Sequence, residues 1–411
     1  PLVEDRLVHS ATIEAGVRRS DYSTTGVSTT WKVGGAIEAV EGFKLRAMYQ
    51  VAVRSPNIQE LYQSPVRALG NLTVDPCAGA TPSAPRILCE ATGMPAGLYG
   101  GVSQPASGQI TLSTQGNRNL DVERAKTLTI GAVVAPRFIP GLSLTVDWFR
   151  IRITDLISAV GQNDVLNGCY SASLNPSQTP NAFCALIERN PVTGTLNTGV
   201  DAAGVSLSSS NLGRLGTGGI DWSARYSFDL ARLFGGDPGN FSLAMSGTWL
   251  DHYWTQSTPN TITRECSGRY STGCTNARPK WKWNVRGTYE KGPFSASLLW
   301  THLSAVAFEP IGPAAGTVPL STPQAGSTTA AYNGILPVFR NVGAYDYIDL
   351  NLDFSVSEEL KLGLLVENLF DRQPPLLGSG VAGTAFNNAN TMPTTYDPLG
   401  RTYTMSVRLR F

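Results

Sequence analysis

The C-terminal end of the chain alternates apolar and polar residues with a period of two. In RTYTMSVRLRF, the apolar positions run from Tyr403 to Phe411, and the positions between them are polar or charged. The segments YIDLNLDF (347–354) and KWKWNVRGTY (280–289) repeat this alternation. Successive side chains of a strand point to opposite faces. Each segment is therefore predicted to be a strand with one apolar, aromatic-rich face and one charged face.

The same pattern predicts twelve strands. They cover approximately residues 7–19, 28–39, 43–53, 121–134, 142–152, 214–229, 240–251, 280–290, 293–303, 345–355, 359–369 and 401–411. Short connections at 40–42, 135–141, 231–239, 291–293 and 356–358 alternate with longer ones. This alternation is typical of an up-and-down antiparallel barrel whose short turns face the periplasm and whose long loops face outside. The expected fold class is therefore all-β, a transmembrane β-barrel, because the charged face would be too costly in the core of a soluble protein.

The tryptophans gather on the apolar face. Seven of the eight occupy positions that point to the apolar face of their strands, namely Trp31, Trp148, Trp222, Trp249, Trp281, Trp283 and Trp300. Trp254 is expected in a loop. Indole rings are enriched where a membrane meets water, so the seven are interpreted as an aromatic girdle in contact with outer-membrane lipid.

Six cysteines form three close pairs within the long connections. The pairs are Cys77 and Cys89, Cys169 and Cys184, and Cys266 and Cys274, each in a stretch rich in turn-forming residues. This spacing predicts three local disulfides and an oxidising compartment. The histidines His9, His252 and His302 are scattered without metal-ligand spacing. Neither a metal nor another cofactor is therefore expected.

Composition and motifs exclude several functional classes. Lys and Arg number 32 against 31 Asp and Glu, so the net charge of +1 lacks the basic footprint of a nucleic-acid-binding protein. No run approaches the ~18 to 20 apolar residues of a membrane-spanning helix. No Gly-x-Ser-x-Gly elbow precedes a helical segment, and Gly213 to Gly219 lacks the Lys-Ser/Thr of a phosphate-binding loop. The chain is therefore not expected to be an enzyme.

Several stretches resemble, in order along the chain, the C-terminal half of TonB-dependent outer-membrane receptors. They are SDYS (20–23), RAMYQVAVRSPNIQEL (46–61), GNRNLDVERAKT (116–127), NLGRLGTGGID (211–221), VENLFDR (366–372), YDPLGR (396–401) and the terminal Phe411. The resemblance covers nearly the whole chain, and the order of the motifs makes it specific.

The resemblance implies a 22-stranded barrel that is filled by an N-terminal plug and contacts the TonB complex of the inner membrane. Residues 1–411 would be the C-terminal portion of that barrel, without the plug and the first strands. A start at Pro1 with no signal-peptide pattern agrees with a truncated chain. The implied function is energised uptake of a scarce solute, such as a siderophore–iron complex or a carbohydrate, across the outer membrane. Phe411 is similar to the signal that the barrel-assembly machinery reads.

Two alternative functions remain open at this stage. A smaller barrel closed by twelve strands would be a passive porin, and a convergent polar site in the loops would suggest a surface enzyme or an adhesin. Solute contact is expected at the long loops, because surface segments on a rigid scaffold carry binding. The candidate contacts are His252, Tyr253, Trp254 and Tyr270, whose rings could stack on a sugar or a flat siderophore. A chance cluster in the girdle explains them equally well.

Overall fold

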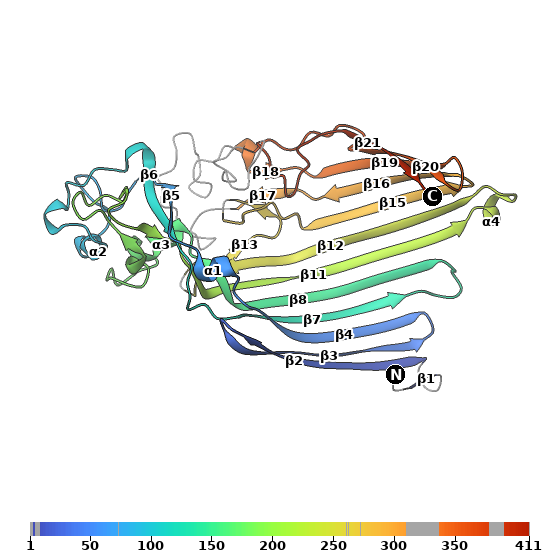
Figure 1. Cartoon of the computed structure of the whole chain (residues 1–411), viewed down its shortest axis with the longest axis horizontal. Coiled ribbons are helices and arrows are strands. Elements are labelled where there is room, and N and C mark those ends of the chain that lie inside the picture. Colours follow the sequence, from blue (N-terminus) through green and yellow to red (C-terminus); the bar gives the residue numbers. More distant parts are fainter. Residues whose placement is uncertain are drawn as a thin grey trace.

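The computed structural model describes residues 3–4, 9–72, 74–259, 261, 263–271, 273–309, 337–377 and 390–410. One long, curved antiparallel sheet dominates it (Figure 1). Its strands in spatial order are β1 (Val3–Glu4), β2 (Ser10–Tyr22), β3 (Gly26–Val40), β4 (Phe43–Arg54), β7 (Glu123–Val134), β8 (Leu142–Ala159), β11 (Ser209–Asp229), β12 (Asn240–Gln256), β15 (Trp281–Lys291), β16 (Phe294–Leu303), β19 (Tyr345–Ser355), β20 (Leu360–Glu367) and β21 (Thr402–Leu409). This is the up-and-down order that the sequence predicts.

The twelve predicted strands are confirmed as β2 to β21 of this path, and β1 adds a two-residue strand at one edge. Several strands are longer than predicted at the loop end, most of all β8, β11 and β12. β8 continues to Ala159, β11 begins at Ser209 and β12 continues to Gln256. The prediction ended these strands earlier because the apolar alternation stops there, whereas backbone pairing continues through the residues beyond it. Trp254 therefore lies in β12, and its expected place in a loop was wrong.

One connection departs from the predicted alternation of short and long. β2 and β3 are joined at the loop end by residues 23–25 alone. Their pairing continues as far as Tyr22 opposite Gly26, beyond both predicted boundaries. Gly26 has a φ of 69°, which a tight turn tolerates at glycine without strain.

The sheet is open in the described part of the chain. β1 and β21 lie at its two ends, and the strand order shows no pairing between them. β1 and the last residues of β21 lie at the end of the sheet that carries the short turns (Figure 1). The strands thus form a section of a barrel wall. No helix among the described residues is long and apolar enough to cross a membrane.

The outer face of the sheet is apolar. The strand register places all seven predicted tryptophans on this one side, which confirms the predicted parity. Large apolar side chains on it are exposed, with Val17 at 77% and Met405 at 83% of full accessibility. Lipid is the environment in which such a surface is stable.

The inner face is polar, and several of its charges are paired. Arg46 donates two hydrogen bonds to Asp147, at 2.9 and 2.6 Å. Thr248 donates to Asp221 at 2.6 Å, and Lys32 forms an ion pair with Glu14. These contacts join neighbouring strands, so they stiffen the wall on the side that faces the barrel interior.

Two connections fold together into what we call the first loop module, residues 55–122 and 160–208. Its elements are α1 (Ile58–Tyr62), β5 (Val66–Asn71), α2 (Arg86–Ala91), η1 (Ala96–Leu98), η2 (Ala106–Gly108), β6 (Gln109–Thr114), α3 (Gln162–Tyr170), η3 (Cys184–Leu186), β9 (Ile187–Glu188) and β10 (Gly204–Ser206). A separate sheet of order β5-β6-β10-β9 supports a core that includes the fully buried Leu88, Ile110 and Leu166. The module extends beyond the loop end of the large sheet (Figure 1).

The other long connections form the second loop module. It contains β14 (Arg269–Tyr270), β17 (Val306–Phe308), η6 (Pro337–Phe339) and β18 (Asn341–Val342), and β13 (Arg264–Glu265) pairs with β12 beside it. Its core includes Tyr270, Phe308, Met392 and Tyr396. The remaining helix, α4 (Ala231–Phe234), lies in the turn between β11 and β12, at the opposite end of the sheet.

Candidate functional site

The first loop module is built around a buried ion pair. Arg189 Nη1 lies 2.7 Å from Asp75 Oδ2, and Arg189 Nη2 lies 2.8 Å from Asp75 Oδ1. Both residues are only 1% exposed. The two-point geometry is the strongest form of the arginine–carboxylate contact. Because 114 positions separate the two residues, no local pattern in the sequence indicates the pair.

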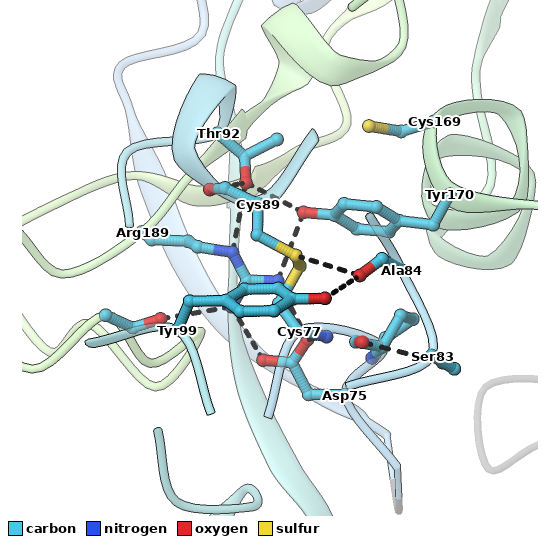
Figure 2. The surroundings of a disulfide bond; sticks show 12 residues. Asp75, Cys77, Ser83, Ala84, Cys89, Thr92, Tyr99, Cys169, Tyr170 and Arg189 are labelled. Atoms are coloured by element: carbon cyan, nitrogen blue, oxygen red, sulfur yellow. Dashed lines mark hydrogen bonds and ion pairs between the residues drawn. A yellow bond between two sulfur atoms is a disulfide. The ribbon is translucent and has the colours of Figure 1, made fainter. Parts of the chain in front are cut away.

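The other hydrogen bonds of Arg189 are also satisfied within this cluster (Figure 2). Nε donates to Thr92 Oγ1 at 3.0 Å, and Nη2 donates to the Tyr170 hydroxyl at 3.1 Å. Burial raises the pKa of Tyr170, so the phenol stays neutral and shares a 2.8 Å hydrogen bond with Thr92. Asp75 and Thr92 follow β4, whereas Tyr170 and Arg189 follow β8. The cluster therefore holds two separate loops in one fixed arrangement.

The three predicted disulfides are present. Cys77–Cys89 and Cys169–Cys184 lie in the core of the first loop module, and Cys266–Cys274 lies beside β14. All six cysteines are buried. Each bond closes within one connection, so both modules are stapled at the loop end of the sheet.

Removing one staple tests this arrangement. The variant Cys169→Ser/Cys184→Ser in the full-length protein opens a crosslink between residues 15 positions apart. We expect the first loop module to lose about 3 kcal/mol of stability. Limited proteolysis should then cut within residues 160–208 faster than in the parent, while non-reducing peptide mapping still finds the other two bonds. Free thiols or exchanged pairs in the oxidised parent would contradict the connectivity.

The predicted aromatic contacts do not converge on one surface. His252 and Trp254 lie opposite Gly218 and Gly216 of β11, on the outer face. Tyr253 lies on the other side of β12, and the guanidinium carbon of Arg278 is 3.8 Å from its ring centroid. Only Tyr253 therefore points away from the lipid side of the sheet.

Tyr270 belongs to the core of the second loop module. Its side chain is fully buried, its hydroxyl donates to the Phe339 carbonyl, and its ring packs edge-on against Phe308 at 5.6 Å between centroids. Burial raises the pKa of Tyr270 to about 12. In this arrangement Tyr270 supports the surface above it and has no exposed ring for stacking.

A half-buried arginine joins the two modules, and sequence patterns gave no indication of it. Arg264 of β13 lies 3.5 Å from Asp164 of α3 and 3.2 Å from Glu309 beyond β17. Ser271 donates to the same glutamate at 2.6 Å. Burial raises the pKa of the Asp164 carboxyl. Burial therefore disfavours a second negative charge at Arg264, in addition to that of Glu309. Arg264 thus fixes the first module relative to the second.

A second arginine anchors the base of the first loop module to the barrel wall. Arg54 at the end of β4 donates to Glu123 of β7 at 2.7 Å and to Glu60 of α1 at 3.0 Å. Asn57 and Glu60 form a reciprocal capping box at the start of α1. These residues lie in the segments 46–61 and 116–127, so the quoted motifs include this anchor although its role was not predicted.

A polar pocket lies beside this anchor. It has a volume of about 370 Å³, and we call it the rim pocket. Its lining includes amide and carboxyl side chains from α1 and the end of β6, namely Asn57, Gln59, Glu60, Gln63 and Gln115. Gln59 and Gln115 are exposed. Such groups can orient a polar solute by hydrogen bonds.

The geometry favours recognition without covalent chemistry. The described residues include no group of three or more His, Cys, Asp or Glu side chains arranged to hold a metal ion. The polar groups around Arg189 and Arg264 bind one another, and the exposed amides of the rim pocket are weak nucleophiles. The rim pocket therefore offers hydrogen-bonding groups at the loop end of the sheet.

The comparisons with known proteins agree with this architecture. The family described as "TonB dependent receptor-like, beta-barrel" matches residues 4–369. The siderophore receptor PirA from Acinetobacter baumannii has a similar fold, with a TM-score of 0.56 and 17% sequence identity. The ferric enterobactin receptor PfeA from Pseudomonas aeruginosa, in complex with BCV-L6, gives a TM-score of 0.59 and 14% identity. Both alignments cover 99% of this chain and 44% of the other, so the chain spans less than half the length of these receptors.

Identities this low show the fold alone, whereas the family match covers most of the sequence. It includes eleven of the long strands, the first loop module and most of the elements of the second. The chain therefore belongs to the TonB-dependent receptor β-barrel family, and its sheet is a section of an outer-membrane barrel wall.

Proposed function

We propose that this chain is part of a transporter that takes up a scarce solute across the outer membrane with energy delivered by the TonB complex. The family consists of transporters and receptors, not enzymes. The observation that carries the proposal is a wall with an apolar outer face and a charged inner face whose groups are partly paired, topped by stapled loop modules. A passive pore has no need of rigid, disulfide-bonded modules at its mouth.

The complete transporter would add a plug domain, a TonB-contacting segment and further strands that close the barrel. The described sheet has two unpaired ends, which such strands would satisfy. Recognition of Phe411 by the barrel-assembly machinery also remains a prediction, and this residue lies outside the described part of the chain.

A metal–siderophore complex is the first solute class to test, since one similar structure is named a siderophore receptor and the other a ferric enterobactin receptor. Carbohydrates and cobalamin form the comparison set. We assign first contact to the rim pocket, because Gln59 and Gln115 offer exposed amides beside the rigid Arg54 anchor. Tyr253 is a second contact candidate, while Tyr270 supports the module from within.

Uptake of labelled solutes by cells carrying the full-length protein tests the proposal. We expect accumulation of one class, and we expect it to fall to background when the TonB complex is deleted. Gln115→Ala should raise the half-saturating concentration about 2- to 10-fold through loss of one hydrogen bond. The matched control is Gln109→Ala, which changes the same residue type on β6 outside the pocket lining.

Uptake that persists without the TonB complex would contradict energised transport and favour the porin alternative. Equal effects of Gln115→Ala and Gln109→Ala would leave transport standing but remove the rim pocket as the contact site. The two results can be told apart, because deletion of the TonB complex tests the energy source of transport, whereas the glutamine variants test the affinity for the solute.

A further inference from the structure

The outer face of β7 and β8 carries four basic residues on the loop side of the girdle. We call Arg124 and Lys126 of β7 and Arg150 and Arg152 of β8 the outer basic cluster. Lys126 pairs with Arg152 and Arg124 pairs with Thr154, in the same register that pairs Ile130 with Trp148. Positions an even number of residues apart share a face. All four basic side chains therefore lie on the same side of the sheet as Trp148, facing the membrane.

The height of the cluster matches the lipid headgroups. Arg150 and Arg152 lie two and four residues beyond Trp148 toward the loops. At about 3.4 Å per residue and a tilt near 45°, these positions are about 5 and 10 Å above the indole ring along the membrane normal. The headgroup layer on each side of a bilayer is about 5 to 8 Å thick. The cluster is therefore at and just above the interface that Trp148 marks.

The oblique course of the girdle supports this height. Trp31 of β3 pairs with Val51, which pairs with Lys126, so these three residues lie in one row across the sheet. Trp300 of β16 pairs with Val285 of β15. Val285 lies four residues nearer the turns than Trp281 on the same strand. The girdle thus steps toward the turn end from β3 to β16, as tilted strands require. On β7 and β8 it passes near Leu128 and Trp148, below Lys126 and Arg152.

The cluster has no acidic partner in the described part of the chain. All four side chains are exposed, and none has a hydrogen bond or an ion pair there. By contrast, Arg46 and Arg54 on the inner side are paired with Asp147 and Glu123. Lys126 and Arg152 face each other directly across the ladder, where like charges are destabilising. An anion from outside the chain would remove this repulsion.

We propose that the outer basic cluster binds the phosphate groups of an anionic lipid in the outer leaflet of the membrane. The guanidinium fork fits phosphate oxygens in two-point contacts, and cations at a membrane surface are attracted to charged headgroups. The proposal uses only the membrane location of the barrel wall. It is independent of the transported solute.

Two aromatic rings of β12, those of His252 and Trp254, lie beside the outer basic cluster. Gly216 and Gly218 of β11 pair with Arg152 and Arg150, so no β11 side chain rises beside these arginines. A Cβ on Gly216 would meet the Trp254 ring at 2.3 Å, and one on Gly218 would meet the His252 ring at 2.6 Å. Both rings therefore lie over the glycines next to the cluster. This placement gives His252 and Trp254 a role in lipid contact.

Lipid retention by the full-length protein tests the proposal. The quadruple variant Arg124→Gln/Lys126→Gln/Arg150→Gln/Arg152→Gln is compared with Arg225→Gln, which removes one exposed arginine from the inner face of β11. Each protein is reconstituted in phosphatidylcholine with or without bisphosphorylated lipid A, and bound lipid is counted by native mass spectrometry. A single variant, Arg152→Gln, serves as a milder probe should the quadruple variant assemble poorly.

We expect the quadruple variant to retain at least about tenfold less lipid A than the parent, because each cation near an anionic surface contributes about fivefold to binding. Arg225→Gln should match the parent, and Arg152→Gln should fall between. Equal retention by all the proteins would overturn the proposal. So would displacement of lipid A by inorganic phosphate at equal concentration, because the site would then recognise free phosphate and not a lipid.

Discussion

Replacing Arg189 with methionine in the full-length protein is expected to unfold the first loop module while the barrel strands stay intact. The substitution leaves the Asp75 carboxylate buried without its partner, and breaking a buried pair in this way costs about 3–5 kcal/mol. Hydrogen exchange and limited proteolysis should show increased opening of residues 55–122 and 160–208. The inner-face contacts of the wall are separate from this cluster, so the exchange of β15 to β20 should not change.

Two variants make the result specific to the buried pair. Arg86→Met removes an exposed arginine in the same module, whose contact with Glu90 at 2.6 Å is of the surface type that contributes about 0–1 kcal/mol. Arg189→Met/Asp75→Leu removes both charges and should recover much of the lost stability, because no unpaired carboxylate remains. Equal opening in Arg86→Met and Arg189→Met would show that the buried pair does not hold the loops together.

The barrel wall could be predicted from the sequence because lipid imposes a local rule. Every second residue of a spanning strand must be apolar, and this requirement is visible in a single segment such as 402–409. The prediction lost accuracy above the membrane, where β11 begins at Ser209 among residues with no apolar period. There the strand continues through backbone hydrogen bonds, which any residue except proline can donate.

The loop modules could be predicted only in part, since long-range contacts build them. Local spacing was enough for the cysteine pairs, because their partners lie within 15 positions of each other. The Arg189–Asp75 pair and the Arg264 junction join residues from different connections, so one sequence carries no sign of them. For the same reason the aromatic candidates were chosen by residue type. The structure instead distributes them between the outer face, the Arg278 contact and the core of the second module.

An arginine on the outer face of β8 is expected to reduce assembly of the barrel, whereas the same change one residue earlier is tolerated. Val146 is 48% exposed on the outer face and pairs with Ala132 and Trp222, between the turn and the girdle at Trp148. An arginine on the lipid face costs up to about 2–4 kcal/mol at the bilayer midplane and less toward the interface, and Val146 lies about 5 Å inside the interface that Trp148 marks. Val146→Arg in the full-length protein should therefore lower the fraction of folded, heat-modifiable barrel in outer-membrane preparations.

Thr145→Arg is the matched control, because threonine and valine have nearly the same shape and the two positions are adjacent on one strand. Thr145 faces the inner side, where it pairs with Val133 and Ser223 and where Asp147 and Asp221 lie on the neighbouring inner positions. A cation there meets water and carboxylates, so the folded fraction should stay close to that of the parent. Similar losses for both variants would contradict the assignment of the two faces. A greater loss for Thr145→Arg would reverse that assignment, because the charged side of the sheet would then face lipid. We do not expect this result, since unpaired charges in hydrocarbon are very costly.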